Sequence, residues 1–150
     1  MEIEKKINES IKDSMKNKNK IRLDSLRAVK SAIILEKTKA GYEGNLNEIT
    51  LINILQKLVK QRNESSKIYV QQNRIELAEI ETTQAKIISE FLPTQLSEFD
   101  LSEIIDKVIK ETKSNSMKDM GKVISIVNNE VLGKAEGSLV AKIIKDKLSS

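Results

Sequence analysis

Glycine and lysine residues near the end of the chain have the types and spacing that suit contact with a phosphate. Gly121-Lys122 falls near the expected start of a helix, where a missing side chain lets a phosphate or another backbone approach closely. Gly137 opens the last expected helix, whose free amides are suited to hold an anion. Neither Gly121-Lys122 nor Gly133-Lys134 has the upstream glycine or the preceding strand of a nucleotide-binding P-loop. The three glycines also fit a structural role, in which they permit tight turns and close packing, with Gly133 ending a helix.

Basic side chains gather in the first third of the chain. Between residues 16 and 39 there are eight basic residues against two acidic ones. They are Lys16, Lys18, Lys20, Arg22, Arg27, Lys30, Lys37 and Lys39. The whole net charge of +4 lies in residues 1–93, because residues 94–150 carry nine lysines and nine acidic residues. Such a stretch suits contact with the phosphates of a nucleic acid, and it equally fits a solvated, lysine-rich helical surface.

The residues that most catalytic sites need are missing. The chain has no cysteine and no histidine. This excludes disulfides, thiolate zinc sites and a cysteine nucleophile, and it removes the commonest general base and metal ligand. Ser65-Ser66-Lys67 pairs a hydroxyl with an amine, but adjacent side chains on a helix point about 100° apart and do not face each other. The acidic residues are scattered among basic ones. We therefore expect no active site of its own, no cofactor and no metal.

The expected location is the cytoplasm. The longest apolar run, Ala32 to Leu35, is far shorter than the roughly 18 residues of a membrane span. The chain opens with Met1-Glu2-Ile3-Glu4, without the basic start and apolar block of a signal peptide. We therefore expect no contact with a membrane.

The elements that position these residues are expected to be helices. Hydrophobic residues make up 39% of the chain and aromatic residues only 3%, so the core is aliphatic, as in helix-on-helix packing. Five glycines and one proline leave few tight turns for a strand-rich fold. The sequence predicts an all-α protein with two subdomains, about four helices in residues 1–93 and a three-helix bundle in residues 94–150. Pro93 marks the boundary, because a proline disfavours helical geometry in the residue before it.

Apolar periodicity places the individual helices. In the first subdomain they are expected over residues 2–16, over about 20–39, from Asn45 or Asn47 to a break at 71–73, and from there to Pro93. The stripe of the third helix begins with leucine and isoleucine and then turns polar, at Arg62, Ser65, Ser66 and Tyr69. A stripe that changes in this way either is exposed to solvent or contacts a partner.

In the second subdomain the first helix starts at a capping box, either Ser97 with Asp100 or Asp100 with Glu103. The next two helices are expected to start near Ser116 and Gly137.

The sequence resembles a known family over essentially its whole length. It looks like a stand-alone YqeY-type protein of the GatB/YqeY family, and its C-terminal part is similar to the tail domain of the B subunit of the tRNA-dependent amidotransferase. The motifs that carry the resemblance are specific by their order and spacing. They are Lys60-Gln61-Arg62 with Ser65, then Arg74 and Leu77, Leu92-Pro93 with Gln95-Leu96-Ser97, Asp119-Met120-Gly121-Lys122-Val123, and Gly133-Lys134-Ala135 with Gly137-Ser138.

Three positions depart from the family pattern. Gln84 stands where the family has an acidic residue, Phe91 where it has a tyrosine, and Glu136 where aspartate is usual. The first two changes remove a charge and a hydroxyl near the subdomain junction. The glycine and lysine positions of the C-terminal part are intact.

The resemblance implies two helical subdomains, of which the second corresponds to a tail that touches tRNA far from the chemistry. Such proteins are commonly labelled with glutamine-dependent carbon–nitrogen ligase activity. That chemistry needs an amidase nucleophile and an ATP site, neither of which the sequence offers, so any such role requires other subunits.

Our leading hypothesis from the sequence is a non-catalytic module that associates with tRNA or another structured RNA. One expected contact surface comprises Gly121, Lys122, Gly133, Lys134 and Gly137. A second basic surface, on the first subdomain, comprises Arg27, Lys30, Lys60, Arg62 and Arg74. The lysines are expected to meet phosphates as point charges, without reading bases.

The rival hypothesis is a protein-interaction adaptor. In it, the polar half of the third helix and the C-terminal bundle dock onto a partner protein. It fits the neutral charge of residues 94–150 better than RNA binding does.

Overall fold

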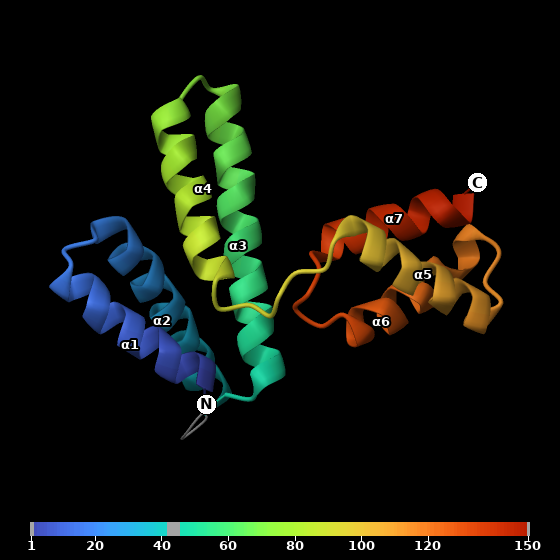
Figure 1. The fold of residues 1–150 in the computed structure, drawn as a ribbon, viewed down its shortest axis with the longest axis horizontal. Coiled ribbons are helices and arrows are strands. Elements are labelled where there is room, and N and C mark those ends of the chain that lie inside the picture. The colour runs from blue at the N-terminus through green and yellow to red at the C-terminus, as the bar shows by residue number, and fades with distance from the viewer. Residues whose placement is uncertain (1, 42–45, 150) are drawn as a thin grey trace. The chain divides into compact units, whose positions relative to one another are not determined.

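The computed structural model describes residues 2–41 and 46–149, and in these residues the chain is helical without a strand (Figure 1). The helices are α1 (Glu2–Lys16), α2 (Lys20–Ala40), α3 (Glu48–Gln71), α4 (Ile75–Ser89), α5 (Glu98–Thr112), the short 3₁₀ helix η1 (Met117–Asp119), α6 (Met120–Glu130) and α7 (Gly137–Ser149). The predicted all-α fold, with four helices followed by three, is confirmed. The chain divides into two compact units, Met1–Leu92 and Pro93–Ser150.

Side-chain caps and a left-handed glycine set the helix boundaries. The Asn47 Oδ1 atom accepts from the Thr50 amide at 2.8 Å, so Asn47 caps α3. The alternative cap, Asn45, lies outside the described residues. Ser97 Oγ accepts from the Asp100 amide at 3.1 Å, which decides the start of α5 in favour of Ser97. Gly41 ends α2 with a φ of 69°, a conformation that suits glycine.

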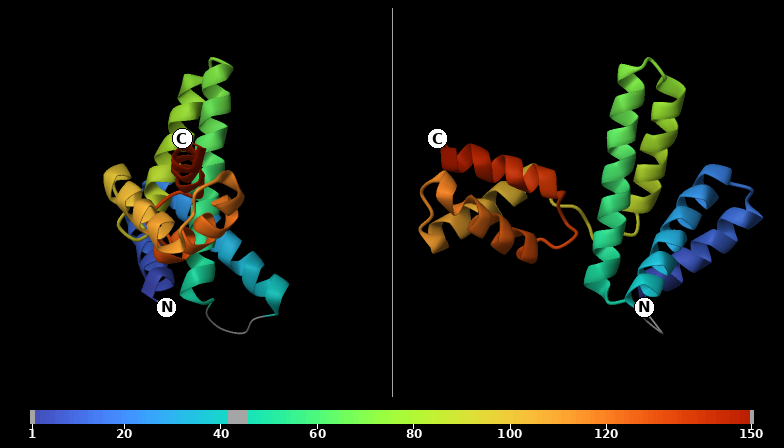
Figure 2. Two further views of the ribbon diagram at one scale, coloured as in Figure 1. Left: turned by 90° about the vertical axis from the view of Figure 1, so that its right-hand side faces the viewer. Right: turned by 180° about the vertical axis from the view of Figure 1, so that it is seen from behind.

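The first unit is built from two helical hairpins, α1–α2 and α3–α4 (Figures 1 and 2). Its core lies where α1, α2 and one end of the α3–α4 hairpin meet. The buried residues there are Ile7, Leu26, Val29, Ile33, Leu46, Leu51, Leu55 and Ile88. The other end of the α3–α4 hairpin extends past α1 and α2, as the front and back views both show. In that part α3 and α4 pack on each other across small side chains such as Ala78.

The second unit is a three-helix bundle with an aliphatic core. Its fully buried residues include Leu101 and Ile105 from α5, Val123 and Val127 from α6, and Ile144 from α7. Among its described residues, no large aromatic side chain belongs to this core, in keeping with the aliphatic core that the composition predicts.

Candidate nucleic-acid interface

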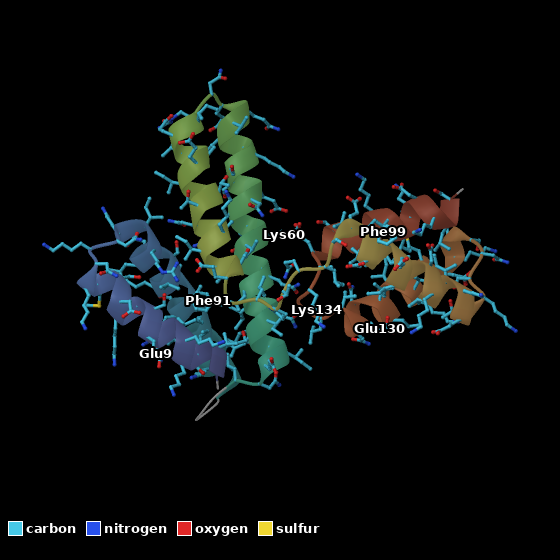
Figure 3. All side chains as sticks on the ribbon, viewed as in Figure 1. Glu9, Lys60, Phe91, Phe99, Glu130 and Lys134 are labelled. Carbon is cyan, nitrogen blue, oxygen red and sulfur yellow. The ribbon has the colours of Figure 1, made fainter. Side chains whose placement is uncertain are left out.

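The turn between α6 and α7 presents Lys134 on a backbone that is held in place. The Gln95 amide group donates to the Gly133 carbonyl at 2.7 Å, and the Leu96 amide donates to the Lys134 carbonyl at 2.8 Å. The Lys134 amide donates to the Val131 carbonyl. The Lys134 side chain itself is exposed (Figure 3). A fixed turn therefore carries an exposed cationic side chain.

Gly133 does not end α6 as the sequence analysis expected. The helix ends at Glu130 with Val131 as its cap residue, and Gly133 lies in the following turn with a φ of 75°. The reason is that Val131 and Ala135 are both buried, so the chain turns back onto the core before α7 begins. Glycine is needed here for the left-handed conformation rather than as a helix stop.

Gly121 and Gly137 stand in open space. Gly121 is the second residue of α6 and Gly137 the first of α7, and a Cβ at either position would meet nothing within 4 Å. Close packing within the chain, one of the two interpretations left open by the sequence, therefore explains neither glycine. The space beside both backbones is accessible from outside.

The five residues of the first predicted surface form two groups. Gly133, Lys134 and Gly137 lie at the C-terminal end of α6, and Gly121-Lys122 lies at its N-terminal end. The 11 residues of α6 separate the two ends by roughly 16 Å. Lys122 and Lys134 are both exposed, and neither takes part in an ion pair among the described residues. The two lysines therefore lie near opposite ends of α6.

The second unit has no net charge, but its acidic and basic residues are concentrated on different helices. Helix α5 carries five acidic residues and two lysines, a formal charge of −3. Residues 113–149 carry seven lysines and four acidic residues, a formal charge of +3. Within the second group Lys147 pairs with Asp106 of α5 at 2.7 Å, while Lys118, Lys122, Lys134, Lys142 and Lys145 are exposed. Lys118, Lys142 and Lys145 were not among the predicted contact residues, although the charge counted by helix instead of by subdomain distinguishes them.

The basic residues predicted for the first unit do not form one cluster. Arg27 and Lys30 lie on α2, Lys60 and Arg62 near the middle of α3, and Arg74 at the start of α4. Lys60 is 11 residues, or roughly 16 Å, from the end of α3 at Gln71, where the chain turns toward Arg74. Figure 3 shows Lys60 on α3. The second basic surface is therefore spread over two hairpins.

Three of these five residues already form hydrogen bonds or an ion pair with other side chains of the chain. Lys30 Nζ donates to Asn8 Oδ1 at 3.0 Å, Arg74 Nε pairs with Glu76 at 3.3 Å, and Arg62 Nε donates to Gln84 Oε1 at 3.1 Å. Arg27 and Lys60 are exposed. Sequence alone gave no signal for the Lys30 and Arg62 contacts, since these depend on how the helices pair, whereas the Arg74–Glu76 contact is local.

Glu76 lies in the first turn of α4, where backbone amides are free. A hydrogen bond from its own backbone amide, followed by the hydrogen bond and charge of Arg74, lowers the pKa of the Glu76 carboxyl from its ordinary value of 4.5. This carboxylate supports the start of the helix, which has no side-chain cap from Arg74.

Acidic side chains and the Ser66 hydroxyl were the remaining groups considered for chemistry. Among residues 2–41 and 46–149 there is no group of three or more acidic side chains that would hold a metal ion. Ser66 Oγ is engaged between α3 and α4, within 3.1 Å of the Ala78 carbonyl and 2.9 Å of Thr82 Oγ1. None of the helices in these ranges is long and apolar enough to cross a membrane.

Comparison with protein families gives a match over nearly the whole chain. The family model described as Yqey-like protein covers residues 4–148. The chain belongs to the YqeY-like family. The resemblance inferred from the motifs is thereby confirmed, and this YqeY-like chain also has relatives among named proteins.

Two of these relatives link the YqeY-like chain to longer proteins. It is 27% identical over 124 residues to altered inheritance of mitochondria protein 41, mitochondrial, of Clavispora lusitaniae, covering 81% of this chain and 71% of that protein. It is 35% identical over 111 residues to the E subunit of glutamyl-tRNA(Gln) amidotransferase of Sulfurisphaera tokodaii. That match covers 70% of this chain and 17% of the amidotransferase relative, so the chain spans less than a fifth of that protein's length.

Proposed function

We propose that this YqeY-like protein is a non-catalytic module that binds structured RNA, in the first place tRNA, through the lysines of η1, α6, α7 and the turn between α6 and α7. The observation that carries the proposal is the separation of charge in the second unit. A unit with no net charge offers a phosphate backbone a region of formal charge +3, in which Lys122 and Lys134 are exposed and outside the ion pairs of the described residues.

The spacing of the two lysine groups supports a large ligand. Lys122 lies near the start of α6 and Lys134 follows its end, and two such contact points suit a helical RNA with many phosphates better than a small anion. Gly121 and Gly137 leave open space for a backbone to come close. With no aromatic platform in this region, binding would follow RNA shape and phosphate positions rather than base identity.

The amidotransferase relative supports tRNA as the first RNA to test. That relative's name includes glutamyl-tRNA(Gln). We infer that a carbon–nitrogen ligase role, if this chain has one, requires catalytic subunits that supply the amidase and ATP sites, and that the protein acts where its tRNA is, in the cytoplasm.

The test is fluorescence anisotropy with labelled tRNA and with an unrelated RNA duplex, titrated at several salt concentrations. The proposal expects binding that weakens steeply with salt and that favours tRNA. The lysine-to-glutamate variants at 122 and 134 should weaken binding, while the same change at Lys107 and Lys110 of the acidic α5 should have little effect. No binding at low salt would refute the proposal.

The rival function, a protein-interaction adaptor, is favoured by a different observation. It is the partly apolar end of the α3–α4 hairpin, which lies beyond the core of the first unit.

A further inference from the structure

Arg62 is held in place by groups that leave its charge uncompensated. Its Nε atom donates to the amide oxygen of Gln84 at 3.1 Å, and its Nη1 atom makes a longer contact, at 3.4 Å, with the Leu58 carbonyl. Both acceptors are neutral. The side chain is half-buried, and among the described residues the ion pairs do not include Arg62. Partial burial of a cation without a counter-charge costs free energy. A carboxylate from another molecule that pairs with Arg62 would offset this cost.

The Arg62–Gln84 bond joins two stripes of side chains into one face. On α3, Arg62, Ser65 and Tyr69 follow each other at spacings of three and four residues and so lie on one side of the helix. On α4, Leu77, Ile80 and Gln84 do the same. We call these six residues the Arg62 face. Ile80 is 41% exposed, and the neighbouring Ile68 is 53% exposed.

The same stripe is covered at one end and uncovered at the other. Toward the core, Leu58 of α3, Ile87 of α4 and Phe91 just after α4 pack against the first unit's core, where α2 lies against α4. The core includes none of the residues from Arg62 to Gln84. The outer end of the α3–α4 hairpin extends past α1 and α2 (Figures 1 and 2). The change from an apolar to a mixed stripe therefore coincides with the end of the cover that α2 provides.

The contacts at the covered end of the α3–α4 stripe indicate which kind of partner fits the uncovered end. There the covering element is a helix, and its Arg22 pairs with Glu90 at 2.7 Å beside packed aliphatic side chains. At the uncovered end the aliphatic side chains and a cation are present, and no described helix of the first unit supplies the cover and the carboxylate. We infer that the Arg62 face docks an amphipathic helix of a partner protein, with aliphatic residues one turn apart and an aspartate or glutamate on the same stripe.

RNA is the poorer occupant of this face. A phosphate backbone is bound by several cations at once. The Arg62 face has one guanidinium and shares its surface with Leu77, Ile80 and Tyr69, and the half-buried Glu81 follows Ile80 on α4. The inference therefore assigns Arg62 to a carboxylate and is independent of the RNA proposal.

Gln84→Glu is the variant that isolates the charge of Arg62. The new carboxylate would occupy the place of the present amide and neutralise the guanidinium in the same geometry. The matched control is Gln71→Glu, the same chemical change at an exposed residue nine positions after Arg62, on the opposite side of α3. Circular dichroism of both variants verifies that the helices are intact.

The probe is a displayed library of amphipathic helical peptides. Each peptide carries leucine or isoleucine at i, i+4 and i+7, and position i+3 is varied among Asp, Glu, Asn, Gln and Lys. Selection against the full chain should enrich aspartate and glutamate at the varied position. The enriched peptides should lose about tenfold or more in affinity for Gln84→Glu, bind less tightly to Ile80→Ala, and bind Gln71→Glu as they bind the parent chain.

Three results would overturn the inference. The first is a set of selected peptides that lack acidic residues or bind Gln84→Glu unchanged. The second is a loss of tRNA affinity in Gln84→Glu and not in Gln71→Glu, which would make RNA the ligand of Arg62. The third is a dimer in analytical ultracentrifugation that Ile80→Glu dissociates, which would make a second copy of the chain the occupant.

Discussion

Two regions of this protein carry cations outside the ion pairs of the described residues, and their surroundings differ. In the second unit, Lys122 and Lys134 are exposed ammonium groups in a region of positive charge. In the first unit, Arg62 is half-buried, oriented by Gln84 and on one face with Leu77 and Ile80. Exposed point charges suit a phosphate backbone, whereas a fixed and partly desolvated guanidinium suits a carboxylate carried on an apolar surface. The contrast shows that basic residues of one chain need not share one ligand.

The largest expected effect contrasts the covered and uncovered ends of α4. Ile88 is fully buried, so Ile88→Ala should lower the free energy of unfolding of the first unit by about 2–5 kcal/mol. Ile80→Ala removes a side chain that is 41% exposed and should lower it by less than about 1 kcal/mol. Urea denaturation monitored by circular dichroism measures both. Equal losses would mean that the stripe is covered along its whole length.

The next effect is on RNA affinity. Lys122→Glu combined with Lys134→Glu replaces two attractive charges with repulsive ones and should weaken tRNA binding about 100-fold at low salt. The slope of the logarithm of the binding constant against the logarithm of the salt concentration should also become shallower, by the amount expected for the loss of about two phosphate contacts. The control is Lys107→Glu with Lys110→Glu on α5, and an equal loss there would mean that the charge separation does not select the binding region.

A smaller effect is expected on stability from Gln84→Glu. The variant creates an ion pair with Arg62 at a half-buried site, which should raise the free energy of unfolding by about 0.5–1 kcal/mol. Gln71→Glu should change it by less. If Gln84→Glu destabilises the first unit, Arg62 already has a counter-charge and the contrast between the two cations fails.

The smallest effect concerns the pH dependence at the start of α4. The pKa of Glu76 is lowered in the folded chain, so its ionised form contributes stability above about pH 4.5, and that contribution is lost as the pH falls through the lowered pKa. Glu76→Gln removes this contribution. Thermal unfolding should therefore distinguish the two chains at pH 7 and bring them together in acid, while a constant difference at all pH values would contradict the assignment.

The parts of the fold that the sequence predicted are those decided locally. Apolar periodicity located the helices, and the caps Asn47 and Ser97 were recognisable because a cap acts on amides only three residues away. The choice between Ser97 and Asp100 as the start of α5 needed the structure, since both fit the same local pattern.

The candidate sites were less predictable because they depend on pairing between elements. The bond from Arg62 to Gln84 spans 22 residues and is set by the register of α3 against α4. The separation of Lys122 from Lys134 follows from where α6 begins and ends, and Gly133 was misplaced because burial of Val131 and Ala135 turns the chain back after Glu130. Residue type gave the chemistry of these positions but not their neighbours.

The most direct test of the contrast is a backbone amide NMR map of the full chain with tRNA added at low salt. The account predicts that the amides whose chemical shifts change lie around Lys118, Lys122 and Lys134, while the chemical shifts of the Arg62 face and of α5 stay unchanged. Perturbations centred on Arg62 and Gln84, or none in either unit, would contradict it.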